Sequence, residues 1–116
     1  MISQYFEMKE FACPCCGANG MQEEFLKRLE DARTMAGIPF VITSAFRCDS
    51  HNKEVGGKVN SSHLDGWAGD IACNSEQRRY TVFRSCLLAG FRRFGPKKKF
   101  IHVDCDPSKN PRRLWI

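Results

Sequence analysis

The clearest amphipathic pattern along the chain predicts a helix over residues 21–36. Acidic residues occupy its first turn, where they interact favourably with the helix dipole. Gly37 is a typical residue for ending a helix, and Pro39 cannot continue one. Apolar side chains recur at helical spacing, and Leu26 widens their stripe, at Met21, Phe25, Leu29, Ala32 and Ala36.

Three later segments have the composition of β-strands. β-branched and aromatic residues predominate in residues 40–46, 67–73 and 100–105. The polar stretch between the first two strands, residues 49–57, predicts a loop with one helical turn.

A second helix is expected between the last two strands. Asn74 or Ser75 can cap its first turn, and Gly90 predicts its end. Its apolar face is expected to comprise Tyr80, Phe83 and Leu87. Elements in this order predict an α+β fold, a small antiparallel sheet with flanking helices, in a single domain over residues 1–116.

Composition narrows the class of protein. No apolar run is long enough to cross a membrane, and the first residues lack the basic and apolar regions of a secretory signal. We therefore expect a chain made in the cytoplasm, without membrane insertion. Membrane, collagen-like, disordered and secreted disulfide-scaffold classes are excluded. The net charge of +5 suits an anionic partner, either nucleic acid or an anionic cell-wall polymer.

Three polar residues have a spacing that suits a metal ion. His63 and Asp70 are separated by a turn at Gly66, so both side chains can approach one point. His102 and Asp104 are two apart on a predicted strand and share a face. Two histidines and one carboxylate suit a catalytic zinc site with an open fourth position, although such residues also form ordinary polar pairs.

Two motifs resemble those of a known family: Ser61-x-His63-x-x-Gly66-x-Ala68-x-Asp70 and His102-x-Asp104. An upstream segment extends the match through Thr43-Ser44-Ala45-Phe46-Arg47, Asn52 and Gly56-Gly57. Together they resemble the zinc D-Ala-D-Ala carboxypeptidases and phage L-alanyl-D-glutamate endolysins, whose fold is shared with the hedgehog signalling domain. The chain looks most like the short members found in phages and prophages.

This resemblance implies a role for each matching residue. His63, Asp70 and His102 correspond to the zinc ligands. Arg47 corresponds to an arginine that holds a substrate carboxylate or polarises the scissile carbonyl. Ser61 is expected to bind substrate or a ligand, or to serve only in a turn. Asn52 is expected at the substrate site, orienting the loop that carries Arg47, or as an ordinary loop residue.

The chain departs from the family where many relatives carry a general base or its helper. Lys99 and Phe100 occupy the two expected positions, and neither can act as a base in the same way. Asp104 is the nearest alternative. It can activate a metal-bound water, or only hold His102 in position without binding the metal itself. Asp65 is a weaker candidate for the base.

Seven cysteines without a secretory signal favour reduced thiols. Cys13 and Cys16 form a C-x-x-C pair that Cys48 and His51 can complete as a structural metal site, if the fold brings them together. A reduced turn, with Cys15 inside it, is the alternative. The remaining cysteines are expected in the core, at Cys73, Cys86 and Cys105.

The resemblance implies a monomeric zinc peptidase that cleaves D-amino-acid-containing peptides of bacterial peptidoglycan, as carboxypeptidase or endopeptidase, after synthesis in the cytoplasm. A non-catalytic, zinc-containing wall-binding module is the second hypothesis. A nucleic-acid binder built on Cys13 and Cys16 is a weaker third, and we expect no nucleic-acid partner. The basic runs at residues 92–93 and 97–99 favour a solvated loop near the site, and the alternative is that they bind carboxylates or phosphates of the wall.

Overall fold

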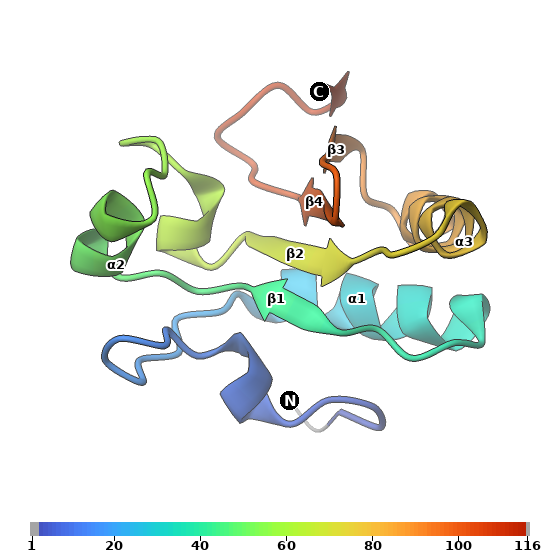
Figure 1. Cartoon of the computed structure of the whole chain (residues 1–116), viewed down its shortest axis with the longest axis horizontal. Helices are drawn as coiled ribbons and strands as arrows, with labels where there is room; N and C mark the ends of the chain where they lie inside the picture. Colours follow the sequence, from blue (N-terminus) through green and yellow to red (C-terminus); the bar gives the residue numbers. More distant parts are fainter. Residues whose placement is uncertain (1–2, 116) are drawn as a thin grey trace.

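The computed structural model describes residues 3–115. They form an α+β fold in which helices flank one mostly antiparallel sheet, as predicted (Figure 1). The helices are α1, Glu23–Ala36; α2, Asp49–Glu54; and α3, Glu76–Leu88, with short 3-10 helices η1, Met8–Phe11, and η2, Ser62–Asp65. The strands are β1, Ile42–Ser44; β2, Ala68–Ala72; β3, Arg93–Pro96; β4, Phe100–Asp104; and β5, Arg113–Leu114.

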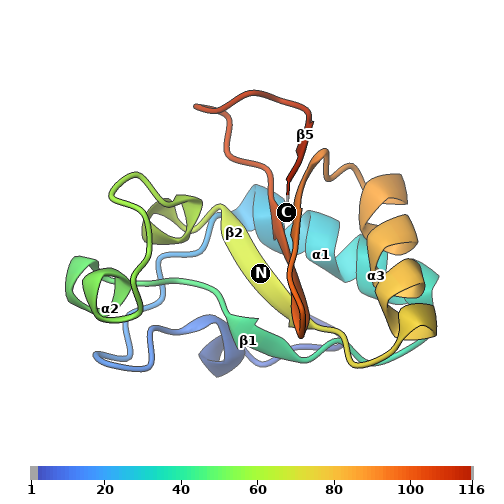
Figure 2. The ribbon, with the colours of Figure 1, turned by 45° about the horizontal axis from the view of Figure 1, so that its top comes forward.

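The sheet has the strand order β1-β2-β4-β3-β5, and only the β3–β5 pair is parallel. The long central strands β2 and β4 pair over their full length. Helices α1 and α3 pack against each other beside the sheet (Figure 2). An edge-to-face contact between Phe25 and Phe91, both fully buried, joins α1 to the segment after α3.

The first predicted helix begins two residues later than expected, at Glu23, because Gln22 is extended and its backbone N–H donates to the Gly66 carbonyl. It ends at Ala36 as predicted, with Gly37 in the left-handed conformation. Segment 49–57, expected to be mainly loop, contains the six-residue helix α2. None of the described helices has the length and apolar character needed to cross a membrane.

The predicted apolar face of α3 is wrong for two of its three residues, whereas Phe83 packs against the core as expected. Tyr80 is 65% exposed and Leu87 39% exposed, whereas Val82 and Cys86 are completely buried. Ser85 is buried with them because its hydroxyl donates to the Thr81 carbonyl of the same helix. A buried serine whose hydroxyl is hydrogen-bonded within its own helix interrupts the apolar stripe of the buried face. The sequence pattern therefore favoured a neighbouring face of the helix.

The predicted solvated loop before the last strand is partly wrong. Strand β3 begins within the first basic run, ends just before the second and pairs with β4, and Arg93 in it is only 8% exposed. Gly95-Pro96 looks like a turn in sequence, but both residues pair with β4. The lysines at residues 97–99 are exposed, as expected of a loop.

Candidate active site

The three expected metal ligands come from three elements that meet at the centre of the sheet. Asp70 on β2 and His102 on β4 are direct partners in the antiparallel register, so their side chains share a face. His63 lies on η2, just before β2. The Asp70 Oδ1 atom lies 3.1 Å from His102 Nδ1 and 3.3 Å from His63 Nε2. The potential ligand atoms of all three residues lie within 4.8 Å of one another.

Each imidazole is held by a second contact on its other nitrogen. His63 Nδ1 lies 2.6 Å from the Ala45 carbonyl oxygen, which can only accept. His102 Nε2 lies 2.7 Å from Asp104 Oδ2. The Ala45 carbonyl requires a proton on His63 Nδ1, and the shorter of the two His102 contacts, to Asp104, favours a proton on His102 Nε2. With the protons in these places, the nitrogens that face Asp70 are the ones available to a metal.

The electrostatic environment of His63, Asp70 and His102 favours a positive charge among their side chains. Burial alone would lower the pKa of His102, but its contacts with Asp104 and Asp70 raise it. Burial likewise opposes ionisation of Asp70, yet His102 and His63 lower the pKa of its carboxyl. Two imidazole nitrogens and a carboxylate oxygen form a donor set that suits zinc and leaves a fourth position open. The residues therefore fit the metal ion that the resemblance implies.

Asp104 lines the cleft, but both of its carboxylate oxygens are already engaged by neighbouring side chains. It is 1% exposed, its Oδ2 faces His102, and its Oδ1 accepts a 2.6 Å hydrogen bond from Arg93 Nε. Burial opposes ionisation of Asp104, but His102 and Arg93 lower the pKa of its carboxyl. Of the two roles expected for Asp104, these contacts favour the fixing of His102. Asp65 is exposed on η2 and is not among the residues that line the cleft.

The Arg47 guanidinium lies near Asp70 Oδ2, the carboxylate oxygen other than the one near the two histidines. Its Nη2 atom is 3.5 Å from Asp70 Oδ2, while Nε donates to Ser44 Oγ and Nη1 to Asn52 Oδ1. Asn52 is buried, donates to the Lys58 carbonyl and does not line the cleft. This placement corresponds to an orienting role for Asn52 rather than to a contact with substrate.

The close packing of Asn52 and Arg47 depends on Gly57. A Cβ atom at this position would overlap Asn52 Oδ1 and lie 3.1 Å from Arg47 Nη1. Ser61 has a comparable local role: its Oγ accepts the backbone N–H of His63 and caps η2, at the edge of the cleft.

The metal-site residues open into a cleft of about 830 Å³. Among the described residues that line it, Asp70 and Asp104 are the carboxylates. Basic side chains outnumber them, at Arg47, Lys58, Arg93, Lys97, Lys109 and Arg113. The cleft is therefore suited to an anionic ligand.

Two residues of the site were missed in the sequence. Arg93 lies directly opposite Asp104 in the register of β3 and β4. The Trp115 ring lies 5.4 Å from the His102 ring and 5.3 Å from the Arg93 guanidinium carbon. Gly95 allows this approach, since a Cβ there would come within 2.7 Å of Trp115. The sequence signal that could have found Arg93 was the alternation of side chains along a strand. Gly95-Pro96 hid this signal because the pair is typical of a turn.

The cysteine-rich turn forms a separate group with Cys48. Cys13, Cys16 and Cys48 are brought together as the structural-metal hypothesis required, but Cys15 takes the fourth position instead of His51. His51 lies on the first turn of α2, where its backbone N–H donates to Cys48 Sγ. Burial opposes ionisation of Cys13, but the backbone amides of Cys48 and Cys15 lower its pKa to about 6.

Comparison with known proteins identifies the family. No curated protein sequence shows significant similarity to the chain. The family model described as peptidase M15 matches residues 4–104, which include the N-terminal segment, the Arg47 region and all three expected metal ligands. The match covers most of the 116 residues. The chain therefore belongs to the M15 peptidase family.

Proposed function

We propose that this M15 peptidase is a zinc enzyme that hydrolyses D-amino-acid-containing peptide bonds of bacterial peptidoglycan. The observation that carries the proposal is the arrangement of His63, Asp70 and His102 at the floor of a basic cleft, with Arg47 beside them. The expected reaction is of the D-Ala-D-Ala carboxypeptidase or L-Ala-D-Glu endopeptidase type. Synthesis in the bacterial cytoplasm, from a phage or prophage, and action on the wall belong to the same proposal.

Different residues of the protein are expected to hold the ion, to orient the imidazoles and to contact the substrate. His63 Nε2, Asp70 Oδ1 and His102 Nδ1 would hold the ion, and a bound zinc supplies hydroxide at neutral pH by lowering the pKa of water to about 7. Ala45 and Asp104 keep the two imidazoles in the required tautomer. Arg47 offers its guanidinium to a substrate carboxylate, or to the carbonyl oxygen as negative charge develops on it.

The positive charge of the cleft supports peptidoglycan stem peptides as the substrate. Peptidoglycan stem peptides carry free carboxylates, and basic side chains line the cleft at residues 47, 58, 97 and 109. Because Ser44 and Asn52 hold Arg47 through its Nε and Nη1 atoms, its Nη2 group is already oriented toward the site for a substrate oxygen.

The test combines metal analysis with digestion of purified peptidoglycan, followed by mass spectrometry of the products. Released terminal alanine would indicate a carboxypeptidase, and released stem peptides would indicate an endopeptidase. Replacing His63 by alanine should abolish release, whereas replacing His51, the histidine outside this site, should not. A zinc-loaded wild type that releases nothing from peptidoglycan would contradict the proposal.

One observation favours the non-catalytic alternative, a zinc-containing module that binds the wall. Lys99 and Phe100 replace the residues expected at the base positions, and both oxygens of Asp104 are engaged by Arg93 and His102. Full zinc occupancy with saturable binding of wall fragments, and no hydrolysis, would support this alternative.

A further inference from the structure

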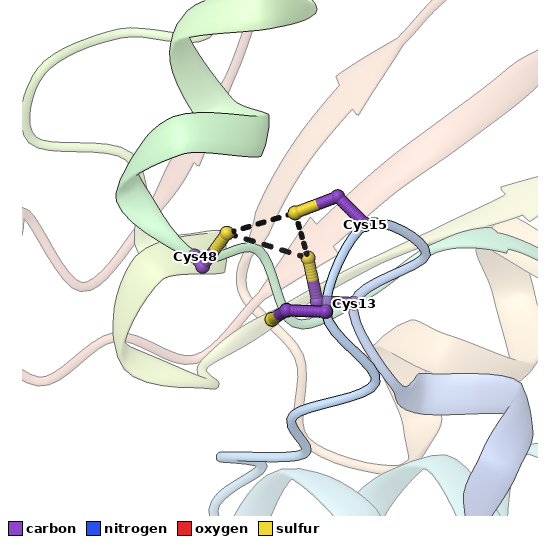
Figure 3. A group of neighbouring side chains, drawn as sticks. Cys13, Cys15 and Cys48 are labelled. Carbon is purple, nitrogen blue, oxygen red and sulfur yellow. Dashed lines mark hydrogen bonds between the residues drawn. The ribbon is translucent and has the colours of Figure 1, made fainter.

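Four cysteines from two distant segments form a compact group of sulfur atoms, the sulfur cluster: Cys13, Cys15, Cys16 and Cys48. Their Sγ atoms all lie within 4.8 Å of one another. Figure 3 shows the side chains of Cys13, Cys15 and Cys48 pointing toward one another. The Sγ separations are 3.5 Å for Cys13–Cys15, 3.6 Å for Cys13–Cys48 and 3.1 Å for Cys15–Cys48.

These distances match a metal site better than a disulfide. Bonded sulfurs lie about 2.05 Å apart, and all four cysteines of the cluster are free thiols. A tetrahedral zinc ion with bonds of about 2.3 Å places its sulfur ligands about 3.8 Å from one another. The three separations found here, 3.1 to 3.6 Å, are shorter than that value but nearer to it than to the length of a disulfide bond.

The backbone around the sulfur cluster is shaped to present the thiols. In the segment Cys13-Pro14-Cys15-Cys16-Gly17, the Gly17 N–H donates to the Cys13 carbonyl, and Gly17 has a φ of 74°. The tight turn brings three sulfurs to one side within five residues. On the facing segment, Cys48 caps α2, and its Sγ accepts the His51 N–H, which fixes the direction of this side chain.

The sulfur cluster also accounts for the unusual cysteine content. The three remaining cysteines, Cys73, Cys86 and Cys105, lie outside it, among core residues or packed against them. A redox pair would need only two sulfurs. Deprotonation of all four thiols would place four negative charges in contact, and a divalent cation removes that repulsion while using all four sulfurs as ligands.

We propose that the sulfur cluster binds a structural zinc ion, distinct from the ion at His63, Asp70 and His102. This ion would join the N-terminal segment to the start of α2. The segment before α1 contains only η1 as a regular element, and a backbone hydrogen bond from Phe46 to the Phe11 carbonyl is one of its links to this part of the chain. Cys48 directly follows Arg47, so the ion would also hold the cleft arginine in place.

The primary test counts metal and identifies its ligands in reduced, full-length protein. Wild type should contain two zinc ions per chain and His63→Ala one. X-ray absorption of His63→Ala should show a sulfur shell at about 2.3 Å. Cobalt replacement in the same variant should give thiolate charge-transfer absorption. These results do not depend on catalysis, so they stand even if the proposed peptidase activity fails.

A cysteine variant tests the location. Cys15→Ser, at an exposed position, should lose one zinc and lower the melting temperature by about 10 °C or more. Cys105→Ala, which removes a thiol outside the sulfur cluster, should keep both ions. His63→Ala without zinc, or with only nitrogen and oxygen ligands, would overturn the proposal, as would a Cys15–Cys48 disulfide in metal-free wild type. If Cys15→Ser does not fold, the measurements on His63→Ala decide.

Discussion

In each histidine of the site, one ring nitrogen contacts a neighbouring residue. This contact determines that the other ring nitrogen faces the metal. Ala45 provides a carbonyl oxygen to His63, and Asp104 provides a carboxylate to His102. The Arg93 guanidinium, itself nearly buried, keeps Asp104 ionised. A single residue in this chain of contacts, Asp104, therefore connects stability with metal binding.

We predict that Asp104→Asn weakens zinc binding about 10–100-fold, because the amide no longer provides a charged partner for His102. It should also destabilise the fold by about 3 kcal/mol, because Arg93 is left as a buried, unpaired charge. Chelator competition and urea unfolding measure the two effects. Asp65→Asn, at an exposed position, is the control. Unchanged zinc affinity would show that Asp104 does not orient His102.

Arg47 differs from a lysine in the number and direction of its donors. It uses Nε and Nη1 to hold its position against Ser44 and Asn52, which leaves Nη2 directed at the site. We predict that Arg47→Lys lowers kcat/KM on a stem peptide about 100-fold, with zinc content unchanged. Lys53→Ala, on the exposed side of α2, should have no effect. Equal kcat/KM for Arg47→Lys and wild type would remove Arg47 from the proposed reaction.

At the scale of elements, the η2 helix is tied to the loop after β4. Ser62 Oγ donates to Asp106 Oδ2, and Lys109 Nζ donates to Ser62 Oγ. Ser108 donates to Asp106 through both its backbone and its side chain. Because His63 lies on η2 and His102 lies on β4, these hydrogen bonds join the two elements that supply the imidazoles.

The pH dependence of stability follows from this connection. Burial opposes ionisation of Asp106, but hydrogen bonds from Ser108 and Ser62 lower its pKa below the ordinary 3.8. Its contribution to stability is therefore present above about pH 4 and is lost as the pH falls toward the folded-state pKa. We predict that wild type loses more unfolding free energy than Asp106→Asn between about pH 7 and pH 3, measured by urea denaturation. Parallel pH profiles would contradict this.

At the scale of the whole molecule, positive charge is concentrated where the substrate is expected. The chain carries a net charge of +5, and the basic side chains of the cleft belong to loops and strands far apart in sequence. Their fields add in the cleft, whose low-dielectric walls strengthen them. The whole fold, rather than one basic motif, creates the attraction for an anionic peptide.

We predict that KM for a stem peptide with free carboxylates rises several-fold between about 0.01 and 0.15 M NaCl, while kcat changes little. Over this range the Debye length falls from about 30 to 8 Å, which screens the cleft from the approaching substrate. Steady-state kinetics measure the effect, and a stem peptide with amidated carboxyl groups is the control. The same salt dependence for both peptides would show that cleft charge does not select the substrate.

The local features of this protein follow from its amino-acid sequence alone. Helical spacing located α1, strand-like composition located β1, β2 and β4, and the motif around His63, Asp70 and His102 identified both the expected ligands and the family. These features depend on residues close in sequence, or on residue types held at fixed spacing, so one chain without its structure is sufficient to find them.

Only the tertiary structure decided which residues meet across elements. The β3–β4 register placed Arg93 against Asp104, and helix packing buried Val82 rather than Tyr80. The approach of two distant segments selected Cys15 rather than His51 as the fourth member of the sulfur cluster. Sequence spacing specifies which face of an element a side chain occupies, but its partner depends on strand register and packing, which involve the whole chain.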